Sequence, residues 1–185
     1  MVEGKAYRSR SSAKRDGQTD RATAQPAIQA PSSESGLASF QNLRQIGKKA
    51  MSHTYGFSID AGKDFEHIIE VVMRELKKQG FGIVSDIDLQ AIFKEKLAID
   101  DGRYRIIGAC NPWVAHQALR AEPDIGLLLP CNVVVREDRD KNVTVAFTAP
   151  EALLGLVYRT DLVKLGMEIR QRLEKVRAVV EAEAT

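Results

Sequence analysis

The chain is poor in the residue types that usually reveal a chemistry. It has two cysteines, three histidines and one tryptophan among 185 residues, and aromatic residues make up only 6%. Two cysteines are too few for the disulfide framework of a small secreted protein, and a reducing compartment would keep them as thiols. The sequence also lacks an apolar run of the roughly 20 residues that a membrane span needs, and it lacks the apolar core of a secretory signal. We therefore expect a cytoplasmic protein with no transmembrane segment.

The larger part of the chain lacks a strong excess of either charge. The formal net charge is +2, but residues 1–50 hold nine Lys and Arg against four Asp and Glu, which gives this part +5 and leaves −3 for the rest. Proteins that bind duplex nucleic acid usually concentrate Lys and Arg on one face. Because the body of the chain has no such surplus, we expect no nucleic acid among its partners.

Composition divides the chain into three parts. Residues 1–35 consist largely of Ser, Ala, Arg, Gln and Pro, which bury too little surface to offset the entropy of ordering, so we expect a disordered tail. Residues 36–51 predict a short amphipathic basic helix or linker, because large apolar residues recur there at threefold spacing. These apolar positions are Leu37, Phe40, Leu43 and Ile46. Residues 52–182 then predict a single folded domain that includes a C-terminal helix.

Hydrophobic periodicity and turn residues predict the elements of this domain. Strands are expected at 54–60, 81–85, 104–109, 125–129, 133–136 and 143–148. Helices are expected from 65 to about 79, from 89 to 97, from 112 to about 121, and from 160 or 161 to near the end. Asp86 or Asp88 can cap the second helix, and Thr160 or Asp161 the last one. Strands and helices that segregate in this way indicate an α+β fold, a two-layer domain with a largely antiparallel sheet covered by helices.

The two cysteines occur in similar surroundings, as Cys110-Asn111-Pro112 and Pro130-Cys131-Asn132. Asn is a favoured N-cap and Pro suits the first helical position, so Asn111 and Pro112 predict the start of a helix, while Pro130 predicts a bulge or kink in a strand. A thiol just before a helix start can have a lowered pKa and gain reactivity. Free cysteine is among the most buried residue types, so a small packing residue is the favoured interpretation of both cysteines. The repeated pattern indicates that two strand ends meet at one place.

Three longer stretches of the sequence carry a resemblance to a known family. They are residues 88–97, 106–112 and 126–135, which read DLQAIFKEKL, IIGACNP and GLLLPCNVVV. In order and spacing they resemble the DUF302 family over roughly residues 54–154. The resemblance implies a small α+β fold of the TT1751-like type, close to TBP-like folds, and a homodimer. It implies no activity. His116 matches a helix motif of the family, whereas Trp113 and Leu153 depart from its usual residues.

These observations leave several functions open. The first is a small-ligand pocket lined by Cys110, Asn111, His116, Cys131 and Asn132. The second is thiol or sulfur chemistry, which needs a thiol of low pKa. The third is a metal or haem site made by His116 with the two cysteines, although their spacing is that of no standard metal motif. The fourth is a homodimeric adaptor module with a basic tail. No complete catalytic motif is present, so neither an enzymatic activity, catalytic residues nor a cofactor is assigned.

Overall fold

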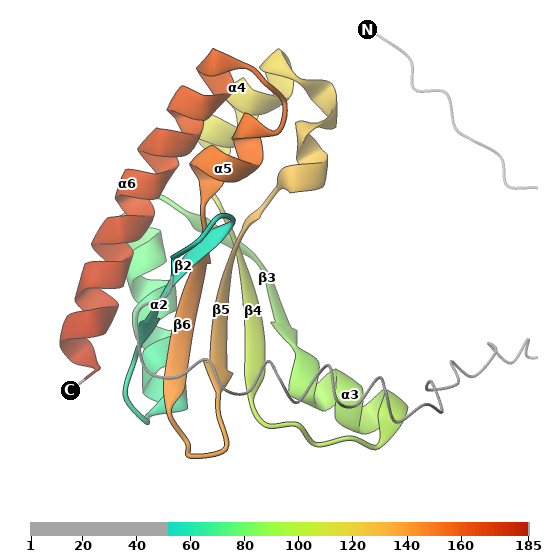
Figure 1. Cartoon of the computed structure of the whole chain (residues 1–185), viewed down its shortest axis with the longest axis vertical. Coiled ribbons are helices and arrows are strands. Elements are labelled where there is room, and N and C mark those ends of the chain that lie inside the picture. Colours follow the sequence, from blue (N-terminus) through green and yellow to red (C-terminus); the bar gives the residue numbers. More distant parts are fainter. Residues whose placement is uncertain (1–51, 185) are drawn as a thin grey trace, which may run out of the picture. The chain divides into compact units, whose positions relative to one another are not determined.

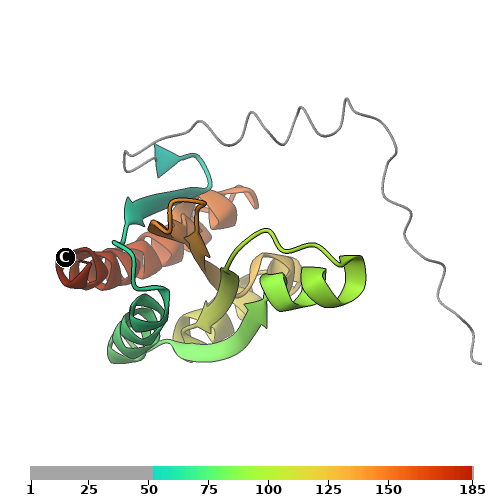
Figure 2. The same ribbon diagram turned by 90° about the horizontal axis from the view of Figure 1, so that it is seen from below.

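The structure is a computed structural model that describes residues 52–184. The predicted tail at 1–35 and the predicted helix at 36–51 lie outside the described residues. Within them, the predicted α+β architecture is confirmed. A six-stranded antiparallel sheet has the order β1-β2-β6-β5-β4-β3, and helices α2 and α6 lie together on one side of it (Figures 1 and 2).

The strands follow the turn signals of the sequence. β1 is the two-residue strand Ser52–His53, and the others are β2 (Gly56–Asp60), β3 (Gly82–Asp88), β4 (Tyr104–Cys110), β5 (Cys131–Glu137) and β6 (Val143–Thr148). β5 and β6 form a hairpin in which Asp138 accepts hydrogen bonds from the amides of Asp140 and Asn142. Among the described strands, the pairing register shifts only in β3, between Ile83 and Ser85. Pro130 does not cause a bulge in β5; it follows a cis peptide bond just before that strand.

Alternation along the strands places one face of the sheet in the core. Residues that are fully buried alternate with residues that are only partly buried, as expected for a sheet covered on one side. The buried ones include Ile107 in β4, Val133 and Val135 in β5, and Val143 and Val145 in β6, each 0% exposed. They pack with the apolar stripes of α2 (Phe65–Lys78) and α6 (Thr160–Glu183) in the main core cluster. This packing fixes the direction in which every side chain of β4 and β5 points.

The helix starts are largely those that the sequence predicts. Asp64 caps α2 through a 3.1 Å hydrogen bond from the His67 amide, and Asp88 caps α3 (Leu89–Leu97) through a 2.9 Å bond from the Ala91 amide. α6 is an exception, because neither Thr160 nor Asp161 caps it. The N-cap residue is Arg159, whose guanidinium bonds to the Asp161 carboxylate and to the Ala121 carbonyl.

One predicted strand is wrong. The apolar run at 125–129 lies in the 3-10 helix η2 (Pro123–Leu128) and in its C-cap residue Leu129, and η2 follows α4 (Pro112–Ala121). Pro123 starts the tight turn and Glu122 accepts a hydrogen bond from the Ile125 amide. Only Ile125 of this run is buried, and Leu127 is 87% exposed. A short apolar run does not distinguish a buried strand from a helical segment, because its periodicity fits both.

The opposite face of the sheet is only partly buried among the described residues, with Ile87 38% exposed. Register places Ile87, Ile106, Val134 and Ala146 side by side in one row across it. α3 lies apart from α2 and α6 at the end of β3 (Figure 2). None of its residues is buried, although it carries the predicted apolar positions Leu89, Ile92, Phe93 and Leu97.

A close approach at Gly166 joins α6 to α5 (Pro150–Gly155). A Cβ at Gly166 would lie 2.6 Å from the Glu151 Cα, closer than real contacts allow. The Gly166→Ala substitution should therefore push α5 away and lower the free energy of unfolding by about 2 kcal/mol. Gly155→Ala is the matched control, because its Cβ would meet only Val163 at 3.9 Å. Urea unfolding of both variants tests this, and equal stabilities would show that the helices do not meet as described.

Candidate functional site

The end of β4 is where the site begins. Cys110 is the last residue of the strand, and Asn111 turns the chain directly into α4. The Asn111 carboxamide makes two bonds: its Oδ1 accepts from the Val114 amide at 3.1 Å, and its Nδ2 donates to the Gly80 carbonyl at 3.0 Å. Gly80 has a φ of +81°, which favours glycine. Asn111 thus caps α4 and, through Gly80, links α4 to the turn that follows α2.

The two cysteines lie on neighbouring strands at the same end of the sheet. Cys131 is the first residue of β5 and pairs with Ala109, the residue before Cys110. Both are free thiols and both are partly buried. The prediction that two strand ends meet here is therefore correct for the cysteines.

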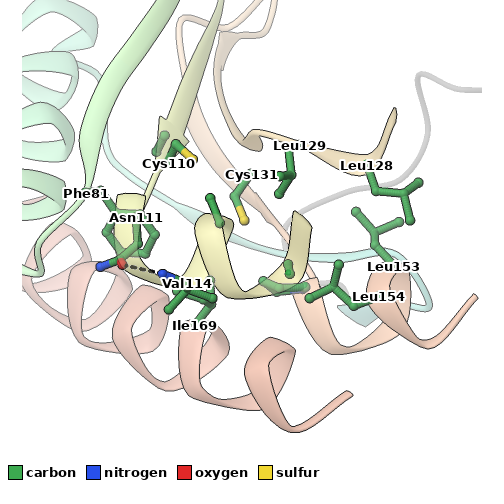
Figure 3. A pocket seen from close by; sticks show the side chains of 14 residues that line it. Phe81, Cys110, Asn111, Val114, Leu128, Leu129, Cys131, Leu153, Leu154 and Ile169 are labelled. Atoms are coloured by element: carbon green, nitrogen blue, oxygen red, sulfur yellow. Dashed lines mark hydrogen bonds between the residues drawn. The ribbon is translucent and has the colours of Figure 1, made fainter. Parts of the chain in front are cut away.

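The cysteines share one cavity (Figure 3). Its volume is about 30 Å³, and the hollow around it measures about 470 Å³ when space open to solvent is counted. β4, β5 and α4 provide one side, and Leu128, Leu129, Leu153 and Leu154 provide the other; Figure 3 shows Leu128, Leu153 and Leu154 grouped away from Cys110. None of the lining residues is Lys, Arg, His, Asp or Glu. The cavity is a small apolar chamber with two thiols in its wall.

The thiols are not activated by the start of α4. Burial raises the pKa of Cys110, and it raises the pKa of Cys131 from 9.0 to about 11. Thr148 counteracts part of the Cys131 shift, whereas Cys110 adds to it. The Thr148 hydroxyl is buried and, within residues 52–184, makes no hydrogen bond of ordinary geometry. Of the two alternatives at Cys110, the raised pKa agrees with a buried packing residue and not with a thiol activated by the helix start, whose Val114 amide is already bonded to Asn111.

Two of the predicted site residues do not reach the cavity. His116 is exposed on α4, two positions after Val114 and two before Ala118, which are the buried residues of that helix. Asn132 follows Cys131 in the strand, so its side chain points to the opposite face, where it is exposed. The described residues contain no group of three or more His, Cys, Asp or Glu that could hold a metal ion. The structure therefore does not assemble the metal or haem site of His116 with the two cysteines.

Several wall residues had no assigned role in the sequence. Leu154 belongs to a second, smaller core cluster with Ala118, Ile125 and Leu162, while Phe81, Val114 and Ile169 belong to the main one. The cavity is lined by both clusters. Leu128 and Leu129 lie in a stretch that carries the resemblance, whereas Leu153 departs from it. Their convergence depends on η2 and α5 folding back over α4, which periodicity alone does not predict.

Comparison with known proteins identifies the family. The sequence profile described as "Domain of unknown function DUF302" matches residues 56–180. The chain belongs to the DUF302 family. An uncharacterized conserved DUF302 protein from Bacillus stearothermophilus has a similar solved structure, with a TM-score of 0.63 and 22% identity over 72% of this chain and 100% of that one. At this identity the likeness supports the fold of the DUF302 domain and nothing more specific.

No curated protein matches the chain. None of the helices between residues 52 and 184 combines the length and apolarity that crossing a bilayer requires.

The raised thiol pKa values predict how the cysteines react. Because iodoacetamide reacts with thiolates, both cysteines should label with pH midpoints above that of the same protein unfolded in urea, and the midpoint of Cys131 should lie near 11. Peptide mass spectrometry over a pH series measures each midpoint separately, independently of how accessible each thiol is. A labelling midpoint below that of the unfolded protein, at either cysteine, would contradict an apolar environment of the thiols and would favour a function in thiol chemistry.

Proposed function

We propose that the DUF302 domain binds a small molecule in the cavity between the ends of β4 and β5, α4, η2 and α5. The observation that carries this proposal is that both cysteines of the chain line one apolar cavity, together with the start of α4. Ligand sites are typically concave and mostly apolar, with few polar groups. The proposal retains Cys110, Asn111 and Cys131 from the predicted site.

Within this site the residues have different roles. Asn111 holds α4 in place through its two bonds, so it shapes the cavity rather than offering free polar atoms to a ligand. Cys110 and Cys131 provide soft, weakly polar wall atoms that are neutral at ordinary pH because burial raises the pKa of both. A binding function agrees with these properties better than thiol catalysis does, since catalysis needs a thiolate.

Native mass spectrometry of the protein purified from its own host tests the proposal. The wild-type chain should carry an added mass that gentle activation removes. Ala115→Leu, which places a larger side chain in the cavity wall, should lose that mass, and Ala152→Leu, on α5 but outside the lining, should keep it. Circular dichroism confirms folding of both variants. A bare wild-type chain, or equal retention by both variants, would count against the proposal.

A second candidate function is a homodimeric module. The observation in its favour is that α3 has no buried residue and that Ile92 and Leu97 are 41% and 48% exposed, next to the row of apolar residues on the sheet that is only partly buried among residues 52–184. Exposed apolar patches often mark interaction surfaces. A second copy of the chain would bury both surfaces.

Light scattering after gel filtration tests the dimer. The wild-type protein should have about twice the 20.5 kDa mass of one chain. Ile92→Lys should give the mass of a single chain, because a charge would be buried in the interface. Met167→Lys is the control, since Met167 is 53% exposed on α6, away from α3. A wild-type mass of 20.5 kDa would rule out the dimer.

A further inference from the structure

The walls of the cavity limit the kind of molecule that it can hold. Twelve of its fourteen lining residues are Phe, Ala, Val, Leu, Ile, Pro or Asn, and the other two are the cysteines. Burying a charge without a counter-charge costs several kcal/mol, and a buried polar group without a hydrogen-bond partner is also costly. Because no lining residue carries a charge, an anion or a cation would find no counter-charge in this wall.

The start of α4 does not provide an anion site either. The first turn of a helix attracts anions through its free amides. Here Pro112 has no amide hydrogen, the Val114 amide donates to Asn111 Oδ1, and the Ala115 amide donates to the Asn111 carbonyl. In the described structure this leaves only the Trp113 amide of that turn for a ligand. One amide is a poor match for a phosphate or a carboxylate.

The thiols add little polarity to this wall. Their raised pKa values keep both cysteines protonated near neutral pH, so neither attracts a cation by charge. His116 is exposed on α4 and does not line the cavity, so its imidazole is not available there as a further ligand for a metal ion.

Room for a ligand must come from the side of the cavity formed by η2. A cavity of about 30 Å³ exceeds the roughly 10–15 Å³ that one water needs, but it is far smaller than the roughly 150 Å³ of an engineered apolar cavity that binds benzene. α5 is fixed to α6 by the close contact at Gly166 and by the ion pair of Glu151 with Arg170. In contrast, no hydrogen bond within the described residues joins 123–128 to 150–155. Outward movement of the Leu128 end of η2 therefore enlarges the cavity without breaking a hydrogen bond to α5, while the buried Ile125 keeps the start of η2 packed in the smaller core cluster.

We propose that this cavity takes an uncharged, apolar small molecule, such as a single-ring or short-chain hydrocarbon group, which enters by displacing η2. The inference rests on the proposed function, because it names the class of ligand for the same site. The exposed Leu127, directly before Leu128 of the cavity wall, offers such a molecule an apolar surface at the entrance.

Methyl NMR of the full-length protein tests the class of ligand with two probes of matched size, toluene and benzoate. Toluene should shift the methyl signals of Ala115, Ala118, Leu128 and Leu153, with an affinity at least about tenfold above that of benzoate, which equals about 1.4 kcal/mol. Ala115→Leu should abolish these shifts and Ala152→Leu should preserve them. Leu128→Ala, which removes a wall side chain on η2, should bind toluene more tightly and exchange it faster.

The outcomes separate this inference from the proposed function. Benzoate that binds at the same methyl groups as strongly as toluene overturns the apolar class but leaves the cavity as a ligand site. A charged molecule or a metal ion that the host-purified wild type carries and the Ala115→Leu variant lacks would likewise overturn the apolar class and leave the cavity as a ligand site. Toluene that shifts no methyl signal of the cavity in either the wild type or Leu128→Ala overturns the inference. If the host-purified protein also carries no added mass, both proposals fail.

Discussion

The transition from β4 to α4 is the constraint on which the site depends. The strand ends at Cys110, and within two residues the chain is helical, because Asn111 provides the cap and Pro112 the fixed φ of the first helical position. The same Asn111 side chain bonds to Gly80, the residue at which the chain leaves α2. One side chain thereby joins the end of the sheet, the start of α4 and the turn after α2. The cavity exists because α4 is held over the start of β5, whose first residue is Cys131.

The surroundings of the cysteines determine their chemistry more than their position in the sequence does. A helix terminus lowers the pKa of a thiol when its amides face the sulfur and water is near. Here one of those amides is used by Asn111, and apolar residues of two core clusters surround the thiols. Desolvation therefore prevails. The repeated Cys-Asn pattern marks two strand ends that meet, and the raised thiol pKa values there agree with the binding function that we propose better than with nucleophilic attack.

Most of the fold could be predicted from the sequence, because its signals are local. Asn111-Pro112 predicts α4 to the residue, and the polar turn at 138–142 predicts the hairpin of β5 and β6. The strand predicted at 125–129 failed because η2 depends on tertiary contacts of Ile125, not on periodicity. The cap predicted at Thr160 or Asp161 failed for a similar reason, since Arg159 is held by the distant Ala121 carbonyl. Contacts between residues far apart in the sequence cannot be predicted from the residue types next to them.

The candidate site could be predicted only in part. Alternation along β5 places the side chains of Cys131 and Asn132 on opposite faces of the sheet. Helical spacing places His116 on a different side of α4 from Val114 and Ala118. The sequence pattern therefore already predicts that Asn132 and His116 do not line the cavity. What the sequence does not contain is the convergence of η2 and α5 on the same cavity. That convergence also makes the wall apolar, and it encloses the pair of cysteines in one cavity.

Diffraction from a crystal of the protein held under xenon pressure tests the central claim most directly, since xenon enters dry apolar cavities. The account predicts a xenon atom between Cys110, Cys131 and the leucines of η2 and α5, with η2 displaced outwards. A xenon-free cavity in crystals that bind xenon elsewhere, or ordered water hydrogen-bonded within it, would contradict the claim that this is an apolar ligand site.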